Sequence, residues 1–337
     1  MKAMLIRTRD GETRLEAAEL ADPGLPAADE LRVRITASTV NYNESLVVRG
    51  AIGVPDRFIT LADAAGVVEA VGPDVVGFAE GDRVISRFFP TWDDDWRAPV
   101  PHFGTTPGLG TDGYAQEVVV VPSNHFSAAP STWSDAEAAV LPVAGMTAWR
   151  ALVVEGGLKA GDSVLVMGTG GVSLFGLQLA KAVGATVIVT SSSDDKLARA
   201  RALGADVTIN YRSTPEWGDA VLEATGGLGA DHVIEVGGAD TLSQSIKAVR
   251  VGGQITMIGM LTGLTGAVPT GDITMKQVRL HGAVVGNGRQ QRELVRAIDA
   301  RDAFRPVIDK TYRLDHLAEA FEDLSSGRHF GKISIEI

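Results

Sequence analysis

A glycine-rich run at residues 168–173 carries the clearest chemical signal in the sequence. The run GTGGVS follows the apolar stretch 163–167, which is typical of a buried strand, and precedes a segment with apolar residues every three or four positions, as in an amphipathic helix. Free backbone N–H groups at such a strand-to-helix turn bind phosphate. We therefore predict a dinucleotide-binding loop, in which glycine permits the tight turn and the approach of a pyrophosphate. Its residues are Gly168, Thr169, Gly170, Gly171 and Val172, with Ser173 in the place of a third glycine.

The end of the next predicted strand indicates which dinucleotide binds. About 20 residues past the first glycine, an NAD site normally has a carboxylate that binds the ribose hydroxyls. Here the strand ends in threonine and three serines (190–193), and the first acid is Asp194. The hydroxyls of Ser191 and Ser192 and the ammonium of Lys196 can bind a 2′-phosphate that a carboxylate would repel. We predict NADPH as the cofactor, although the serines could instead only cap the following helix, with Lys196 on its solvated face.

The composition excludes several classes of site. Cysteine is absent, so disulfides, thiolate nucleophiles and cysteine-ligated zinc are impossible in this chain. Asp and Glu number 42 against 31 Lys and Arg, a formal charge of −11, which argues against a nucleic-acid partner. The apolar runs fall short of the roughly 18 residues that a membrane helix needs, and the N-terminus has no apolar segment of signal-peptide length. We expect a cytoplasmic protein with no membrane partner.

The elements that would position these residues change in kind along the chain. Up to about residue 127, short β-type runs separated by Gly, Pro and Asp predict a compact β-rich domain. From residue 162 onward, nearly continuous apolar strands alternate with helical segments, which is the pattern of a doubly wound parallel sheet. After residue 289 come a helix (289–299), a strand (307–312), a helix (314–324) and a terminal strand (332–337) that could return to the first domain.

We therefore predict an α/β protein of two domains, because 337 residues are too many for one core. The β-rich domain comprises residues 1–127 and 290–337. The doubly wound, dinucleotide-binding domain comprises residues 128–289. The expected strands of the β-rich domain are 31–38, 66–72, 81–86 and 114–121, and those of the doubly wound domain are 163–168, 185–190, 205–210, 231–236 and 253–260.

Motifs spread over nearly the whole chain resemble those of the medium-chain dehydrogenase/reductase superfamily. They are VNYNE (40–44), GVVEAVG with GDRV following (66–84), LPVAGMTAW (141–149), GTGGVS (168–173), TSSSDDKLARARALGAD (190–206), VIEVGG (233–238) and HFGKI (329–333). The resemblance is to the zinc-independent branch that contains quinone oxidoreductases and enoyl reductases. It implies a GroES-like catalytic domain from both chain ends, a central Rossmann domain and an active site in the cleft between them.

The same resemblance bears on zinc. In zinc-dependent alcohol dehydrogenases the position that matches Asn41 is a cysteine, and the positions that match Ala62 and Asp63 are a histidine and a glutamate. Another cysteine falls within the segment PVAG (142–145). Two oxygen donors, on Asn41 and Asp63, make a poor zinc site, so we expect no metal.

The resemblance also assigns residues to parts of the cofactor. Ser192, Lys196 and Tyr211 match residues that contact the 2′-phosphate, and Thr147 matches a residue beside the nicotinamide. Asn41 matches a residue that reaches the nicotinamide ribose or the substrate. Gly286, Asn287 and Lys332 lie in segments that line the cofactor cleft.

Without a Lewis acid, a quinone or an alkene conjugated to a carbonyl is easier to reduce than a simple ketone, because the incoming charge spreads to a remote oxygen.

Tyr42 is the best candidate proton donor, and Glu44 is a weaker candidate. Asn41 would position the substrate or the ribose. Tyr42 could also simply pack at the domain interface. His102 is a further candidate donor. Six aromatic residues could form a wall over a flat substrate or anchor their own loop: Phe88, Phe89, Trp92, Trp96, Phe103 and Trp149.

The sequence thus predicts an NADPH-dependent, zinc-independent oxidoreductase that reduces a small activated alkene or quinone, a substrate expected to be flat or conjugated. Two alternatives stay open. One is a metal-free NADP-dependent alcohol dehydrogenase or carbonyl reductase, and the other is an NADPH-binding structural or sensing protein without turnover. The family resemblance also implies a homodimer, with residues 278–285 as the pairing strand.

Overall fold

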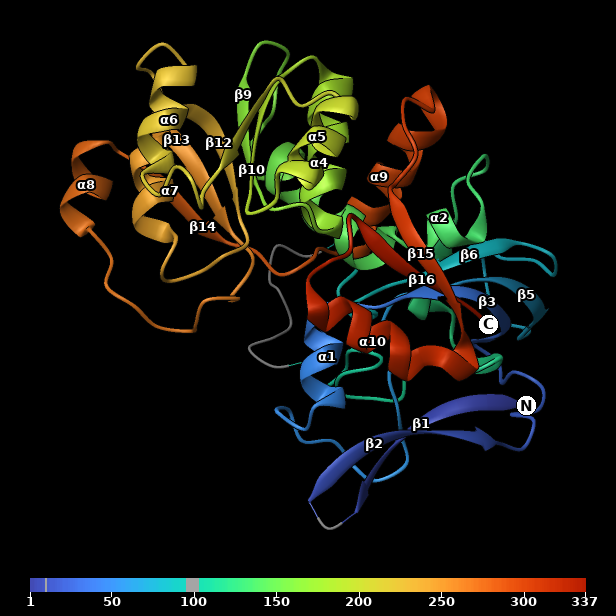
Figure 1. Cartoon of the computed structure of the whole chain (residues 1–337). Helices are drawn as coiled ribbons and strands as arrows, with labels where there is room; N and C mark the ends of the chain where they lie inside the picture. The colour runs from blue at the N-terminus through green and yellow to red at the C-terminus, as the bar shows by residue number, and fades with distance from the viewer. Residues whose placement is uncertain (10, 95–102) are drawn as a thin grey trace. The chain divides into compact units, whose positions relative to one another are not determined.

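The computed structural model describes residues 1–9, 11–94 and 103–337, which form two compact units (Figure 1). The first unit comprises Met1–Met146 and Val285–Ile337, and the second comprises Thr147–Val284. The boundaries expected from the sequence, 127/128 and 289/290, differ from these. The first unit also includes the helical residues that follow β8 (Phe126–Ala128) and the residues just before α9 (Gly288–Arg301).

The described residues of the first unit contain two mainly antiparallel sheets. The larger has the order β15-β16-β3-β5-β6-β8, with β7 also paired to β3, and the smaller has the order β2-β1-β4. The terminal strand does return to this unit, where it pairs antiparallel with β3. The strands are β1 (Lys2–Arg9), β2 (Glu12–Glu19), β3 (Glu30–Thr39), β4 (Phe58–Ile59), β5 (Ala65–Val71), β6 (Arg83–Ser86), β7 (Val118–Pro122), β8, β15 (Ile308–Arg313) and β16 (Lys332–Glu336).

The strand β3 shows how this unit separates core from surface. Its first half alternates, with Leu31, Val33 and Ile35 buried and the arginines between them paired with Glu69 on the other face. Its last three residues are all buried, so the polar ones must find partners inside the protein. The Ser38 hydroxyl accordingly donates to the carbonyl of Asp63 at 2.6 Å.

Among the described residues of the first unit, four α-helices are present: α1 (Tyr42–Val48), α2 (Asp135–Ala138), α9 and α10 (Leu317–Ser326). The helix α10 packs Leu317 and Phe321 into a core that also contains Leu5 of β1 and Ile333 of β16. Residues from both ends of the sequence therefore share one apolar cluster. Short 3₁₀ turns lie at Ser123–His125 and Leu314–His316.

The chain is mostly helical from Asp135 to Val154. The helix α2 is followed by a π-helical turn (Leu141–Gly145), by α3 (Met146–Trp149) and by a second π-helical turn (Arg150–Val154). Within the described residues this is the one helical segment that is long and apolar enough to cross a membrane, and 67% of its apolar window is buried. A helix in the core of a globular protein has the same composition.

The second unit has one sheet of six parallel strands in the order β11-β10-β9-β12-β13-β14. This is the strand order of a doubly wound dinucleotide-binding domain, as predicted. The strands are β9 (Ser163–Met167), β10 (Thr186–Ser191), β11 (Val207–Asn210), β12 (Ala230–Glu235), β13 (Val249–Met257) and β14 (Arg279–Gly282). The helices α4 (Gly171–Val183) and α5 (Asp194–Ala202) cover one face, and α6 (Trp217–Ala224) and α7 (Leu242–Ala248) cover the other, while α8 (Thr270–Met275) precedes β14 (Figure 1).

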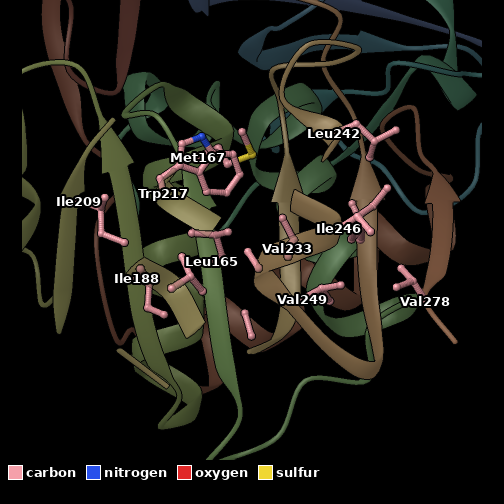
Figure 2. Close-up of a cluster of buried hydrophobic side chains, with 14 residues drawn as sticks. Leu165, Met167, Ile188, Ile209, Trp217, Val233, Leu242, Ile246, Val249 and Val278 are labelled. Atoms are coloured by element: carbon pink, nitrogen blue, oxygen red, sulfur yellow. The ribbon is translucent and has the colours of Figure 1, made fainter. Parts of the chain in front are cut away.

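A buried cluster fixes α6 and α7 on this sheet (Figure 2). Trp217 of α6 and Ile246 of α7 belong to it, together with Leu165 of β9, Ile188 of β10 and Val233 of β12. Each such side chain contributes roughly 1.5–3 kcal/mol when it leaves water. The central strands are therefore held with their carboxyl ends at one edge, where dinucleotides bind in this architecture.

Candidate functional site

The predicted phosphate loop lies between β9 and α4. Gly168 follows β9 with a φ of 71°, a backbone conformation that favours glycine, and Gly170 is the extended residue before the helix. The hydrogen-bond pattern of α4 begins where Leu174 N–H donates to the Gly170 carbonyl at 2.9 Å. The N–H groups before Leu174 therefore lie outside the helical pattern, and no side chain caps them.

The space beside this loop suits a diphosphate. A Cβ atom built on Gly168 or Gly170 would meet no atom within 4 Å, so the loop opens onto free space. Gly176, one turn into α4, differs, because its Cβ would lie 2.5 Å from Ile234 Cδ1. Ser173 ties the helix to the strand through a 2.7 Å bond from its hydroxyl to the Met167 carbonyl. Close packing of helix on strand therefore rests on Ser173 and Gly176, and the first two glycines leave room for a ligand.

The ends of β10 and β11 bring together the residues predicted at the 2′-phosphate. These strands pair in parallel with Ser191 opposite Asn210, and the Tyr211 N–H donates to the Ser191 carbonyl at 3.1 Å. Ser193 caps α5, since its hydroxyl accepts from the Lys196 N–H at 3.4 Å. The nearest acid, Asp194, is exposed and accepts from the Asn210 amide at 2.8 Å. Helix capping thus uses Ser193, and the half-buried Ser192 has no role in it.

Arg212 is a residue at this end that the sequence interpretation missed. It follows Tyr211 directly after β11, its side chain is exposed, and its N–H donates to the Asn210 side-chain oxygen at 3.0 Å. A guanidinium at this place adds positive charge beside the serines. Its only signal in the sequence is its position two residues past the end of a short strand.

A buried polar cluster in the first unit joins β3, α1 and β16. The Asn41 side-chain nitrogen donates to Asp63 Oδ2 at 2.8 Å, and its backbone N–H donates to Glu44 Oε2 at 2.8 Å. The ammonium of Lys332 donates to Asn41 Oδ1 at 2.6 Å and to the Val40 carbonyl at 2.8 Å. The three charged residues are all at most 5% exposed. Lys332, predicted to line the cofactor cleft, therefore has its ammonium bonded inside this unit.

Asp63 is the acceptor at the centre of this cluster. It is fully buried, accepts a short hydrogen bond from the Thr39 hydroxyl, and forms an ion pair with Lys332 at 3.4 Å between Oδ2 and Nζ. Its other oxygen, Oδ1, has no hydrogen-bond partner among the residues that the structure describes. The carboxylate therefore retains unused capacity to accept.

Glu44 is the second buried acid. Burial, and then the negative charge of Asp63, raise the pKa of Glu44 to about 7, against opposing hydrogen bonds from the N–H groups of Ala62 and Asn41 and the charge of Lys332. The Ala62 N–H donates to Glu44 Oε1 at 2.7 Å. With a pKa of about 7, the Glu44 carboxyl group changes from protonated to ionised as the pH rises through neutrality.

Tyr42 and Asn41 differ in what they offer a ligand. Tyr42 is the first residue of α1, is 42% exposed, and lies with its ring 6.0 Å from the guanidinium of Arg49. Its hydroxyl has no hydrogen-bond partner in the described part of the chain. The Asn41 amide, by contrast, is already bonded through both its oxygen and its nitrogen. The geometry favours Tyr42 over Asn41 as the group that donates to a substrate.

The remaining predicted cofactor residues also have structural tasks. Thr147 is buried in α3. A Cβ atom on Gly286 would lie 2.6 Å from Gln290 Oε1 and 2.8 Å from Met146 Cε, so a side chain there would require these two flexible side chains to move. Asn287 caps α9 by accepting from the Gln290 N–H at 2.9 Å. Contacts of these residues with a cofactor stay a prediction.

The loop aromatics form a small core of their own. Phe88, Phe89 and Trp92 are each less than 5% exposed. Phe88 meets Phe89 edge-on with ring centroids 4.7 Å apart, and Phe103 stacks on Phe89 at 6.4 Å. This packing favours the interpretation that they anchor their loop. Trp149 is half-buried in the second unit, and Trp96 and His102 lie outside the described residues.

Comparisons with known proteins settle the family. An alcohol dehydrogenase GroES-like domain model matches residues 27–131, and a zinc-binding dehydrogenase model matches residues 171–300. A zinc-type alcohol dehydrogenase-like protein of Schizosaccharomyces pombe is 40% identical over 333 residues, which are 96% of this chain and 93% of that protein. The chain belongs to the medium-chain dehydrogenase/reductase superfamily. The predicted resemblance is confirmed, and with it the combination of a GroES-like and a Rossmann domain.

Solved structures of superfamily members match the whole chain. A putative alcohol dehydrogenase from Sinorhizobium meliloti 1021 is 43% identical with a TM-score of 0.92, over 100% of this chain and 98% of that one. An NAD-dependent alcohol dehydrogenase is 34% identical with a TM-score of 0.88, over 100% of both chains. The protein is an NAD(P)-dependent oxidoreductase.

A quinone oxidoreductase and a crotonyl-CoA reductase are also among the proteins that match. A quinone oxidoreductase of Pseudomonas syringae pv. Tomato DC3000 is 27% identical with a TM-score of 0.80, over 100% of both chains. The crotonyl-CoA reductase of Streptomyces collinus is 29% identical over 98% of this chain and 83% of that protein.

The superfamily implies two bound groups, a nicotinamide cofactor and a zinc ion, and the residues of this chain fit only the first. The open glycine loop fits the diphosphate of a nicotinamide cofactor. The donor set does not fit zinc, because the ammonium of Lys332 already binds the Asn41 oxygen, Ala62 has no donor, and only Asp63 offers a carboxylate. Within the described residues, no three His, Cys, Asp or Glu side chains are grouped so that they could hold a metal ion.

Proposed function

We propose that this oxidoreductase uses NADPH, works without zinc, and reduces a small activated alkene or quinone. The observation that carries the proposal is the buried cluster of Asn41, Asp63 and Lys332. By the family resemblance, Asn41 and Asp63 match positions at the zinc site of zinc-dependent relatives. A carbonyl reductase needs an electrophile to stabilise the alkoxide, and zinc supplies it in those relatives. A conjugated substrate lowers that requirement, since charge spreads to an oxygen that hydrogen bonds can stabilise.

NADPH, when bound, supplies the hydride. The chain contributes binding and proton donation. The N–H groups at the start of α4 bind the pyrophosphate, and Ser192, Lys196 and Arg212 bind the 2′-phosphate. The exposed hydroxyl of Tyr42 is positioned by α1 to donate a hydrogen bond to the substrate oxygen or a proton to the reduced product.

The names of relatives support both the preferred function and one alternative. The quinone oxidoreductase and the crotonyl-CoA reductase are named for reduction of conjugated systems. Other relatives are named alcohol dehydrogenases, one of them NAD-dependent, which favours a metal-free alcohol dehydrogenase or carbonyl reductase as the second candidate. The local charge at the end of β10 is our reason for preferring NADPH.

A steady-state assay separates these candidates. Oxidation of NADPH and of NADH is followed with a panel of quinones, enones, enoyl thioesters and simple aldehydes, before and after treatment with a chelator. We expect turnover of conjugated substrates with NADPH at a higher kcat/KM than with NADH, unchanged by the chelator. Reduction of aldehydes with conjugated alkenes left intact would support the second candidate, and chelator-sensitive turnover would contradict both.

We further propose a cytoplasmic homodimer without nucleic-acid or membrane partners. The strand β14 is an edge of the six-stranded sheet, and the apolar side chains of Leu280 and Val284 at this edge are 38% and 46% exposed. An exposed edge strand can pair with its copy in a second chain. The charge of −11 supports the exclusion of nucleic acid.

A further inference from the structure

The strand β12 ends in a glutamate, Glu235, that is 0% exposed and begins the turn 236–241. We propose that Glu235 is a positioning residue for the cofactor. Its carboxylate fixes this turn, and the turn forms the surface along which the nicotinamide half of the dinucleotide lies. The inference needs only a nicotinamide cofactor, and it depends neither on the choice between NADPH and NADH nor on the substrate.

Four donors bind the Glu235 carboxylate. Its Oε1 accepts from the N–H groups of Gly237 at 2.7 Å and Gly238 at 3.1 Å, and from the Thr241 hydroxyl at 2.7 Å. Its Oε2 accepts a short hydrogen bond from the hydroxyl of Ser245 in α7. An ionised carboxylate only accepts, which matches a set made up of donors. Without it, two buried backbone N–H groups of the turn would lose their acceptor.

A neighbouring loop also bonds this turn. Thr262 donates to the Gly237 carbonyl through its N–H at 2.9 Å and through its hydroxyl at 3.2 Å. A Cβ atom on Gly259 would lie 1.8 Å from the Val236 carbonyl oxygen, so the two segments approach backbone to backbone. The turn therefore has a fixed conformation, and Glu235 is the group that bonds it to the end of the sheet.

The turn lies where a dinucleotide must cross the sheet. The strand β9 ends in the phosphate loop and pairs with β10 along one edge and with β12 along the other. The chain continues from β9 to β10 and β11 and then crosses to β12, which makes the end of β9 the switch point of the doubly wound sheet. With the pyrophosphate at this loop and the adenosine half over the ends of β10 and β11, the nicotinamide half extends over the end of β12.

One hydroxyl connects this turn with the phosphate loop. Besides its bond to Glu235, the Ser245 hydroxyl lies 3.5 Å from the sulfur of Met167, the last residue of β9. Gly168 of the phosphate loop follows Met167 directly. Glu235 thus belongs to a buried network that reaches both loops that the cofactor meets. A surface that is already ordered spares the cofactor the entropy cost of ordering it on binding.

Nucleotides with and without the nicotinamide half distinguish positioning from folding. Calorimetry measures the Kd of NADPH and of 2′-phospho-ADP, which lacks the nicotinamide riboside, and likewise of NADH and ADP. The variants are Glu235→Leu, which fills similar space without an acceptor, and Glu235→Gln. Asp231→Leu is the matched control, because Asp231 lies near the other end of β12 and also accepts several bonds, two from Ser163 at 2.8 Å and one from Arg250.

We expect Glu235→Leu to raise the Kd of the tighter-binding complete nucleotide at least about tenfold and to change the Kd of its fragment by less than about threefold. Glu235→Gln should retain both affinities, because its oxygen can accept the three bonds of Oε1 while its nitrogen donates to the Ser245 hydroxyl. Asp231→Leu should lower the Tm and leave both Kd values unchanged. Equal losses for nucleotide and fragment in Glu235→Leu, or no loss for either, would overturn the proposal.

Thr241→Val decides the matter if Glu235→Leu is insoluble. It keeps the shape of the side chain and removes one of the four donors, so we expect a smaller loss, about threefold to tenfold, again confined to the complete nucleotide. An effect of the same size on the fragment, or none on the complete nucleotide, would overturn the proposal. These measurements use no substrate, so the steady-state assay reports separately on the proposed function.

Discussion

Two lysines show how differently single ammonium groups are used in this chain. Lys332 is buried and bonded to three oxygens of its own unit, whereas Lys196 lies half-buried in the first turn of α5, beside the free ends of β10 and β11. The first was predicted to line the cofactor cleft; its ammonium is bonded inside an internal cluster, and its contact with the cofactor stays a prediction. Lys196 stays our best candidate for binding the 2′-phosphate of NADPH.

Replacement of Lys196 tests that assignment. Loss of one charged hydrogen bond to a phosphate costs roughly 1.5–3 kcal/mol, or about a tenfold to hundredfold loss in affinity. We expect Lys196→Ala to raise the Kd for NADPH by that factor and to change the Kd for NADH by less than about threefold. Calorimetric titration of both nucleotides measures it, with the exposed Lys159→Ala as control. Equal losses for both nucleotides would contradict the assignment.

Glu44 makes a prediction about pH. Its pKa is raised from 4.5 to about 7 in the folded chain, so between these values the folded state binds more protons than the unfolded state. Stability from this group is therefore fully present below about pH 4.5 and is lost as the pH rises toward 7. Relative to Glu44→Gln, the wild-type protein should lose up to about 3 kcal/mol between about pH 4.5 and 8. Urea unfolding at several pH values measures this difference, and parallel curves for the two proteins would contradict it.

At the scale of elements, the α/β half of the fold was predictable and the helical connections were not. The strands β9, β10, β12 and β13 are continuous apolar runs bounded by helices with a clear period, so local pattern and tertiary role agree. The run at 114–121 was predicted as a strand, but the structure has β7 only from Val118, because Tyr114 and Ala115 pair instead with the Leu61 and Thr60 carbonyls. The helix α1 has seven residues and was missed for want of a periodic pattern.

The polar cluster shows a second limit of the sequence. The partners Asn41 and Lys332 are 291 residues apart, and no local pattern connects them. The family motifs predict that both residues lie near the cofactor, and that contact stays a prediction. The pairing of β16 with β3 brings the two residues close together in the fold, where they bond to each other.

The loop between β9 and α4 makes a prediction that separates binding from folding. Gly170 has a φ of −81°, and a Cβ there would meet no protein atom, so Gly170→Ala should change the free energy of unfolding by less than about 1 kcal/mol. The methyl group would nevertheless occupy the space of the pyrophosphate, and we expect the Kd for the cofactor to rise at least about tenfold. Gly168→Ala, at a φ of 71°, should also lose about 1 kcal/mol of stability. Denaturant unfolding and fluorescence titration distinguish the two effects, and unchanged binding in Gly170→Ala would place the pyrophosphate elsewhere.

At the scale of the whole molecule, the free edge of β14 predicts assembly. If β14 pairs with β14 of a second chain, a glutamate introduced into this strand is present in both copies, and the two negative charges lie near each other and repel. We expect Leu280→Glu to convert a dimer to a monomer, measured by size-exclusion chromatography with light scattering. Leu228→Glu, which changes a side chain 75% exposed on another surface of the unit, should leave the mass unchanged. A wild-type monomer, or a dimer in Leu280→Glu, would remove β14 as the interface.

The pairing of β3 with β16 also sets an order for folding during translation. The Rossmann unit is one continuous stretch, Thr147–Val284, and has all its strands before β16 is made. At a synthesis rate of about 5–20 residues per second, the 291 residues between Asn41 and Lys332 take roughly 15–60 s on the ribosome. During that time Asp63 has no ammonium to neutralise it, and the edge of β3 that β16 will cover is open to other strands. The nascent chain should therefore acquire a protease-resistant cofactor-binding unit first, and chaperones that shield strand edges should act on the residues that were synthesised earliest.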